Sequence, residues 1–222
     1  MFKNLPPGLA PLFALCVCIL LADQASAAQD RCPKGGGGWH SACFTEDAGV
    51  RHVKPQYLGR LKWNRAGYAL VSRADAFDLM AVNRQGKVVV PGIYHTGDFD
   101  YPDAERGVGR FATPDGKCGY FQARGFQVVV PARYDVCQAF HDGRAIACTG
   151  CTRYCEDEDC HIDRLVGGDG VALALDGTVR ERFTLPTLDT VCGTPERRLL
   201  TPRSGADLLR CAGDRNPFDD LK

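Results

Sequence analysis

The sequence predicts an all-β fold of tandem antiparallel β-hairpins that repeat at a period of about 40 residues, carry disulfide staples and end in short irregular or helical segments. The first observation is a doubled phrase: V-V-V-P-x-x-Y occupies residues 88–94 and again 128–134. The second is that the apolar runs are short, β-branched or aromatic, and bounded by glycine, proline and aspartate, as in strands joined by turns. The third is a dense, even set of cysteines.

Glycines mark the same two places in successive units. One set opens a first apolar run, with spacings of 40 and 36 residues: Gly67, Gly107 and Gly143. A second set precedes a later run, with spacings of 39 and 52 residues: Gly86, Gly125 and Gly177. The longer last interval holds a cysteine-rich insert at 148–166. A regular period of this size is typical of repeat arrays, in which each unit buries its apolar face against its neighbour.

The segment GVALALDGTVRERF shows the strand pattern most clearly. Large apolar residues alternate with alanine over residues 171–175, which is the period of a strand. Asp176 and Gly177 then predict a two-residue hairpin turn in which both residues have positive φ. Pro91 and Pro131 are predicted to end the two valine strands, because proline has no N–H to donate to a sheet. No long window within the repeats shows the apolar stripe of a helix.

Residues 1–27 are interpreted as a secretory signal peptide. Lys3 precedes an apolar run over residues 9–22, and Ala25-Ser26-Ala27 gives the small-x-small pattern of a cleavage site. The run is shorter than the roughly 20 residues that a membrane-spanning helix needs. We therefore expect a periplasmic or secreted protein with no membrane span after signal cleavage.

Ten cysteines follow the signal, and in an exported chain such an even set indicates structural disulfides. They are Cys32, Cys43, Cys118, Cys137, Cys148, Cys151, Cys155, Cys160, Cys192 and Cys211. The expected pairs at the two ends are Cys32 with Cys43 and Cys192 with Cys211, since each flanks a terminal loop. The insert reads C-x2-C-x3-C-x4-C-H, a spacing that would suit zinc if its thiols stayed reduced. An oxidising compartment favours disulfides there instead.

The segment 116–145 resembles the bacterial WG repeat family, whose units read G-K-W-G-Y-I, a turn, G, an apolar strand, P, Y and later F-x-x-G-x-A-x-V. The matching positions, with their counterparts in the earlier unit, are Gly86, Pro91, Tyr94, Gly116, Lys117, Gly119, Tyr120, Gly125, Pro131, Tyr134, Phe140, Gly143 and Ala145. The resemblance covers residues 57–183. It implies β-rich interaction or surface modules in which these residues have structural roles.

One position departs from the family pattern, because Cys118 stands where the family has tryptophan. A cysteine leaves much of the ring volume unfilled, and a covalent tie can offset part of that cost. The resemblance therefore implies a bridge from Cys118 to Cys137, or alternatively to a cysteine of the 148–160 segment.

The two ends are expected to be caps on a repeat domain at 57–183, tied down by their own disulfides. Residues 28–56 hold a glycine run, which we interpret as a loop and not as a phosphate cradle. Residues 184–222 are rich in proline, and within them SGADLLRCA predicts a short helix capped by Ser204. Caps of this kind hide the open edges of an array.

Nothing in the sequence indicates a reaction or a cofactor. The formal net charge is +0, and lysine and arginine are scattered, so there is no electrostatic case for nucleic acid. Asp98, Asp100 and Asp103 lack the spacing of a calcium loop and are expected in an ordinary turn-rich connection. We therefore expect a non-catalytic binding or interaction module whose partner is an unknown protein or a component of the cell envelope.

Two alternatives stay open. The first is a cell-wall or carbohydrate-binding protein that uses aromatic stacking platforms, for which the candidates are Trp39, Tyr57, Trp63, Tyr101 and Tyr154. The second is a hydrolase with a site assembled across repeats. A cleft that joins His141, Asp142 and a serine of the mature chain would strongly favour it.

Overall fold

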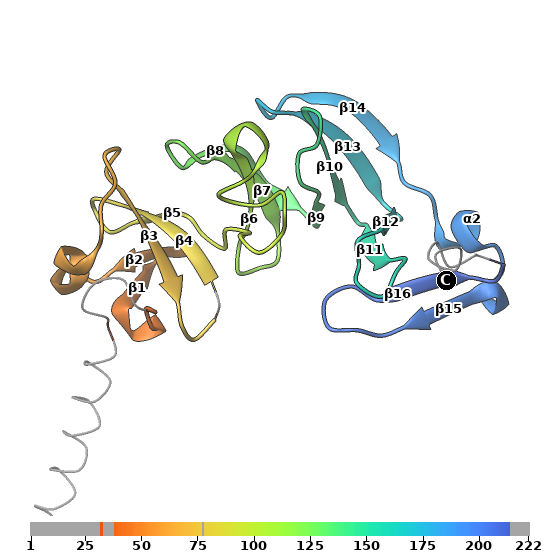
Figure 1. The fold of residues 1–222 in the computed structure, drawn as a ribbon, viewed down its shortest axis with the longest axis horizontal. Coiled ribbons are helices and arrows are strands. Elements are labelled where there is room, and N and C mark those ends of the chain that lie inside the picture. Colours follow the sequence, from red (N-terminus) through yellow and green to blue (C-terminus); the bar gives the residue numbers. More distant parts are fainter. Residues whose placement is uncertain (1–31, 33–37, 77, 214–222) are drawn as a thin grey trace, which may run out of the picture. The chain divides into compact units, whose positions relative to one another are not determined.

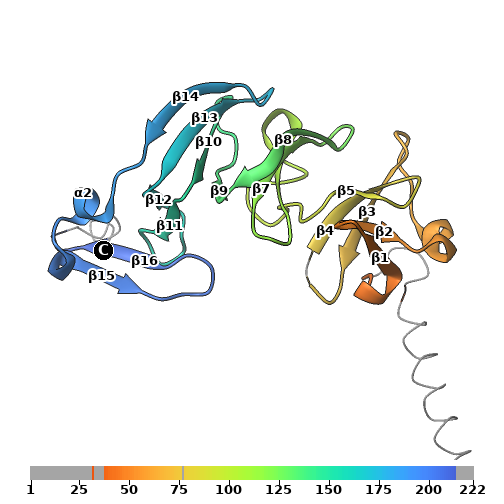
Figure 2. The same ribbon diagram turned by 180° about the vertical axis from the view of Figure 1, so that it is seen from behind.

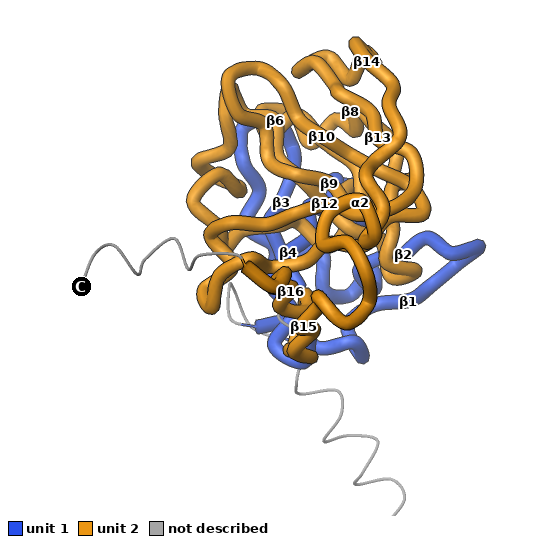
Figure 3. Tube along the Cα trace, turned by 90° about the vertical axis from the view of Figure 1, so that its right-hand side faces the viewer, with its two compact units in different colours: residues 1–89 blue, residues 90–222 orange. Residues whose placement is uncertain are grey.

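The computed structural model describes residues 32, 38–76 and 78–213, and divides into two compact units (Figure 3). Unit 1 comprises residues 1–89 and unit 2 residues 90–222. The predicted signal peptide and most of the glycine run lie outside the described residues. Within the described residues, none of the helices has the length and apolar character needed to cross a bilayer.

Unit 1 contains one hairpin and one three-stranded sheet (Figure 1). Its elements are η1 (Ser41–Cys43), β1 (Phe44–Asp47), β2 (Val50–Val53), η2 (Pro55–Arg60), β3 (Tyr68–Arg73), β4 (Asp78–Asn83) and β5 (Val88–Val90). Trp39, Tyr57, Val71 and Met80 pack in its core, where the Cys32–Cys43 disulfide is also buried. The predicted N-terminal bridge is therefore confirmed.

Unit 2 contains three sheets, whose strand orders are β6-β7-β8, β14-β13-β10-β9 and β12-β11-β16-β15. The first two use β6 (Val108–Ala112), β7 (Cys118–Gln122), β8 (Gln127–Tyr134), β9 (Val136–Cys137), β10 (Arg144–Thr149), β13 (Asp169–Ala174) and β14 (Val179–Thr184). The third uses β11 (Thr152–Cys155), β12 (Asp163–Val166), β15 (Arg198–Thr201) and β16 (Leu208–Cys211). The short helices are η3 (Glu105–Gly107), α2 (Leu188–Cys192) and η4 (Pro195–Arg197).

The prediction of a β-rich, mainly antiparallel fold is confirmed. The valines of the two copies of the phrase lie in β5 and β8, and each of these is the third strand of a three-stranded sheet. The sheets are thus larger than the two-stranded hairpins that we expected. The cysteine-rich insert forms β11 and β12 between β10 and β13, and β11 pairs in parallel with β16 of the C-terminal segment (Figures 1 and 2). The insert and the C-terminal segment therefore share one sheet.

The core of unit 2 lies between the first two sheets. Tyr120, Phe140 and Leu173 are fully buried, and the rings of Tyr120 and Phe140 meet edge to face at 5.0 Å. Tyr134 is buried nearby, while its counterpart in the earlier unit, Tyr94, is 39% exposed. The two tyrosines that occupy the same place in the doubled phrase therefore differ in environment.

Three local predictions are wrong. Pro131 does not end its strand. Cys118 and Tyr120 are two residues apart on β7, but their partners on β8, Tyr134 and Val130, are four residues apart. The extra residues of β8 form a bulge, which accommodates a proline because a bulged residue need not donate an N–H to the sheet. Asp176 does not have positive φ, because a three-residue turn joins β13 to β14 and only Gly177 is left-handed. The segment after Ser204 is strand β16, since Leu208 and Leu209 are buried in pairing with β15 and not along a helix.

All ten cysteines expected to pair do so. The bridges are Cys32–Cys43, Cys118–Cys137, Cys148–Cys151, Cys155–Cys160 and Cys192–Cys211. Both predicted terminal pairs are confirmed, and so is the first-named partner of Cys118. The Cα atoms of Cys118 and Cys137 are 6.0 Å apart, within the range of about 4.4 to 6.8 Å that a disulfide requires.

Candidate functional site

A pocket of about 660 Å³ opens on unit 2, where its three sheets approach one another. Its size falls within the range of roughly 300 to 1,000 Å³ that is usual for small-molecule sites. One wall comes from the loop after β5, a second from β9 and the connection to β10, and a third from β11, β12 and the turn before β16. The residues that give it chemical character are Tyr94, Phe99, Gln138, His141, Arg153 and Asp163.

The first wall presents aromatic rings to solvent. Phe99 is 53% exposed and Tyr94 39% exposed. The ring of His141 meets that of Phe99 edge to face, with the ring centroids 5.7 Å apart. Exposed rings that line a concave pocket offer apolar faces to a ligand, whereas scattered exposed apolar residues need no explanation.

An ion pair between a buried aspartate and a partly buried arginine holds this wall in place. Asp100 is 3% exposed, and its Oδ1 accepts hydrogen bonds from Nε and Nη2 of Arg110 at 2.9 and 2.7 Å. Its Oδ2 accepts a bond from the backbone N–H of Gly97, which closes the loop around Phe99. Arg110 also donates to the carbonyl oxygen of Cys137 and lies over the Tyr94 ring at 4.8 Å. The ion pair therefore fixes the aromatic loop against β9.

The second wall is fixed by the hydrogen bonds of its backbone. The N–H of Gln138 donates to the carbonyl of Ile146, and its own carbonyl accepts from the hydroxyl of buried Tyr120 at 2.9 Å. His141 begins a tight turn that is closed by backbone hydrogen bonds between His141 and Arg144, and within it the N–H of Gly143 donates to the carboxylate of Glu105 at 2.7 Å. These bonds set the positions from which Gln138 and His141 line the pocket.

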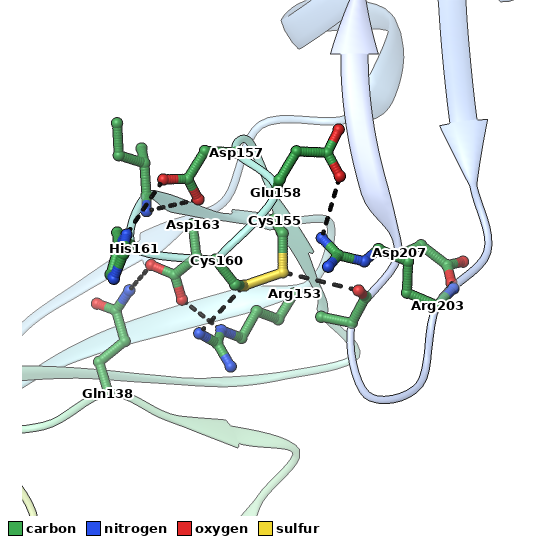
Figure 4. Close-up of a disulfide and its surroundings, with 12 residues drawn as sticks. Gln138, Arg153, Cys155, Asp157, Glu158, Cys160, His161, Asp163, Arg203 and Asp207 are labelled. Carbon is green, nitrogen blue, oxygen red and sulfur yellow. Dashed lines mark hydrogen bonds and ion pairs between the residues drawn. A yellow bond between two sulfur atoms is a disulfide. The ribbon is translucent and has the colours of Figure 1, made fainter. Parts of the chain in front are cut away.

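The third wall is polar and comes from the cysteine-rich insert. Asp163 accepts a hydrogen bond from Nε2 of Gln138 at 3.3 Å and forms an ion pair with Arg153, as Figure 4 shows. Nη2 of Arg153 also lies 3.6 Å from the sulfur of Cys160. The Cys155–Cys160 disulfide closes the acidic loop beside it. Gln138, Arg153 and Asp163 are therefore joined in one network at the pocket edge.

Charges in the pocket are balanced in pairs. Arg110 is paired with Asp100, Arg153 with Asp163, and Asp135 with Lys117. The Lys117 ammonium, together with a hydrogen bond from the N–H of Gly150, lowers the pKa of Asp135 below its usual value. Each arginine and aspartate that lines the pocket therefore has an oppositely charged partner, so the pocket does not favour a strongly charged ligand.

The aromatic residues predicted as stacking platforms lie elsewhere. Trp39 and Tyr57 are buried in the core of unit 1, and Trp63 is half-buried beneath the guanidinium of Arg84. Tyr101 and Tyr154 are also half-buried, and none of the five lines the pocket. The prediction of an exposed platform is therefore wrong for Trp39 and Tyr57, while Trp63, Tyr101 and Tyr154 are partly exposed outside this pocket. Phe99 was missed; the signal that could have found it is an apolar ring within the otherwise polar loop H-T-G-D-F-D.

Of the serine, histidine and aspartate that would support a hydrolase, only the histidine and the aspartate lie close together. His141 Nδ1 lies 3.1 Å from the carboxylate of Asp142, but both side chains are largely exposed and belong to the same turn. Of the three serines after the predicted signal, Ser41 and Ser72 belong to unit 1, and Ser204 precedes the pocket residue Gly205 without lining the pocket itself. A serine, histidine and aspartate therefore do not meet in the described pocket.

The cysteine-rich insert uses its sulfurs in covalent bonds. Cys148–Cys151 and Cys155–Cys160 are disulfides, so these sulfurs are not thiolate ligands. Between Cys155 and Cys160 lies an acidic run at residues 156–159, in which Glu156 forms an ion pair with Arg164 and Glu158 with Arg210. The described residues contain no group of three or more histidine, cysteine or acidic side chains arranged to hold a metal ion.

Residues 124–150 match the family model of the WG containing repeat. The chain contains a WG repeat. The matched segment runs from the turn before β8 through β9 to the end of β10, so the WG repeat supplies the second wall of the pocket, from Asp135 to His141. It also carries Cys137, Gly125, Pro131, Tyr134, Phe140 and Gly143, which the resemblance had singled out. No curated protein matches the chain.

Proposed function

We propose that this chain is an exported, non-catalytic WG-repeat protein that binds a ligand in the pocket of unit 2. The observation that carries the proposal is the pocket itself, which joins two exposed aromatic rings to a network of hydrogen-bonded polar side chains. Sites for small molecules have this composition, with apolar surface and a few fixed polar groups. The pocket walls include no serine or free thiol that would serve as a nucleophile.

Three sheets in series support the repeat interpretation. The strand sets β3-β4-β5, β6-β7-β8 and β10-β13-β14 each consist of strands that neighbour one another in a sheet. The first strand of each set follows one of the glycines Gly67, Gly107 and Gly143, all of which have positive φ. We infer that the chain contains three WG-like units at the period of about 40 residues, the third being split by the disulfide-rich insert.

Export is supported by the five disulfides, which persist in oxidising compartments. The protein acts in the periplasm or outside the cell, where its partner is a molecule of that compartment or of the cell envelope. Fusing residues 1–27 to a reporter that is active only after export tests the signal peptide. Thiol counting on the exported protein should give no free thiols, and ten free thiols would contradict this part of the proposal.

A thermal-shift screen tests the binding function. Compounds of several classes, including saccharides, nucleotides, amino acids and peptides, are added to the wild-type protein and to Phe99→Ser. We expect at least one compound to raise the melting temperature of the wild type and to lose that effect in the variant. Leu70→Ser is the matched control, because Leu70 is an exposed apolar residue of unit 1. Turnover of model esters or glycosides that disappears in His141→Ala would instead favour a hydrolase.

A further inference from the structure

We propose that the pocket of unit 2 is a saccharide site, in which Phe99 and Tyr94 stack against a neutral sugar ring while Gln138, Arg153 and Asp163 bind its hydroxyl groups. This inference rests on the proposed binding function and names the class of ligand. It places the site on residues other than the five aromatic residues that the sequence indicated.

The aromatic wall fits the apolar face of a sugar. A pyranose ring has faces of C–H groups and a rim of hydroxyls, so it combines an apolar surface with a polar edge. Phe99 offers a ring that is 53% exposed and that meets the ring of His141 edge to face. The loop beneath it is fixed by the Asp100–Arg110 ion pair. A platform that is already ordered loses little conformational entropy when a ligand stacks on it.

The polar network fits the hydroxyl rim. Hydroxyl groups donate one hydrogen bond and accept others, so they match a site that holds both donors and acceptors. Asp163 offers carboxylate oxygens, Arg153 offers guanidinium N–H groups, and Gln138 has both an amide N–H and an amide oxygen. Because Asp163 bonds both neighbours, the three side chains are oriented before any ligand arrives. Carboxylate, guanidinium and amide groups are planar, and when they are held in fixed positions each can form hydrogen bonds with two adjacent hydroxyls.

The paired charges of the pocket favour neutral sugars over anionic ones. Every arginine of the pocket has a carboxylate partner, and Asp135 has Lys117. A phosphate or uronate group would have to compete with these carboxylates for the guanidinium groups, which disfavours an anionic ligand. A wholly apolar ligand would strip water from the polar wall without replacing its hydrogen bonds. The pocket therefore favours a neutral saccharide, and its volume of about 660 Å³ gives room for a short oligosaccharide.

The test uses the full mature chain with its disulfides formed. The probes are neutral oligosaccharides, namely gluco-, manno- and N-acetylglucosamine oligomers, with oligogalacturonate and inorganic phosphate as anionic counterparts. Binding is measured by calorimetry and by saturation-transfer NMR. We expect a neutral oligosaccharide to bind, with a Kd that changes less than about twofold between low and high salt, because no net charge is matched.

Variants then locate the site. Phe99→Ser should weaken saccharide binding by about tenfold or more, because stacking on the ring is lost. Asp163→Asn should also weaken it, because it replaces an acceptor and frees Arg153 from its carboxylate. Leu199→Ser is the matched control: Leu199 is 62% exposed on β15, away from the pocket lining, so its substitution should leave the Kd unchanged. Retained melting temperatures show that the variants fold.

The remaining outcomes of these experiments distinguish a failure of the saccharide inference from a failure of the proposed binding function. If a nucleotide, peptide or anionic glycan binds and Phe99→Ser abolishes that binding, the saccharide inference is overturned while the proposed binding function stands. If sugars bind equally well to the wild type and to Phe99→Ser, the site is wrongly placed. If no compound of any class binds in a way that depends on Phe99, both the saccharide inference and the proposed use of the pocket fail.

Discussion

Removing the Cys118–Cys137 bridge should destabilise unit 2 by an amount that the structure allows us to work out. The two cysteines are 19 residues apart in sequence, and closing a loop of that length is worth about 3 kcal/mol on the chain-entropy model. Both side chains are buried, so alanine is the replacement of choice, since serine would bury an unsatisfied hydroxyl. For a unit of this size, a loss of about 3 kcal/mol lowers the melting temperature by roughly 10 °C.

The assay compares the double variant Cys118→Ala/Cys137→Ala with the matched pair Cys32→Ala/Cys43→Ala. Both tryptophans, Trp39 and Trp63, belong to unit 1, so tryptophan fluorescence reports on that unit, while circular dichroism reports on all strands. We expect the first double variant to lower the melting transition seen by circular dichroism. The second should lower the transition seen by fluorescence.

A small effect would refute the reasoning. Suppose that the double variant at 118 and 137 melts within about 2 °C of the wild type. The bridge would then contribute little stability, and it would not offset the loss of the tryptophan that the family has at position 118. Hydrogen exchange gives an independent reading, because protection should fall first in β7 and β9, the two strands that the bridge joins.

Three further predictions concern the packing and electrostatics of unit 2. Gly119→Ala should destabilise the protein by about 3 kcal/mol or more in chemical denaturation, because an added Cβ would lie 2.3 Å from the carbonyl oxygen of Val130 and backbone cannot easily give way. Tyr120→Phe should cost about 1 kcal/mol in the same assay, since it removes the hydrogen bond to the carbonyl of Gln138; no loss would mean that another group satisfies that carbonyl. The lowered pKa of Asp135 stabilises the folded state at pH values above the ordinary aspartate pKa, and that contribution should disappear as the pH falls through the lower folded value. The melting temperature of Asp135→Asn should therefore depend less on acid pH than that of the wild type, and identical pH profiles would argue against this role.

The strand content and the oxidised state of the cysteines could be predicted because they depend on local signals and on cysteine usage, whereas the pairs Cys148–Cys151 and Cys155–Cys160 were not predicted. Period-two alternation and turn residues reveal strands without knowledge of their partners. The pairing of Cys118 with Cys137 was one of two options that the resemblance to the WG repeat family implied, because Cys118 stands where the family has tryptophan. Pro131 could not be assigned in this way, because a strand can pass through proline only where its neighbour allows a bulge. That neighbour is known only once the sheet has formed.

The pocket could not be predicted because tertiary contacts make it. Tyr94 and Tyr134 occupy the same place in the doubled phrase, yet one lines the pocket and the other is in the core. Asp98 and Asp100 look alike in sequence, but only Asp100 is buried, because Arg110 faces it from β6. The side chains of Trp39 and Tyr57 have the chemistry of a platform, and only packing shows that the core of unit 1 uses them.

The order of the five disulfides has a consequence for how the chain matures. Ten cysteines allow about 945 pairings. The native set is the single one in which the cysteines, counted along the chain after the predicted signal, pair as first with second, third with fourth, and so on to ninth with tenth. A polypeptide that emerges amino end first presents its thiols in that same order. An oxidant that joins each new thiol to the one before it would produce the native set with no later reshuffling. Maturation should therefore depend on a dithiol oxidase and proceed normally in cells that lack a disulfide isomerase.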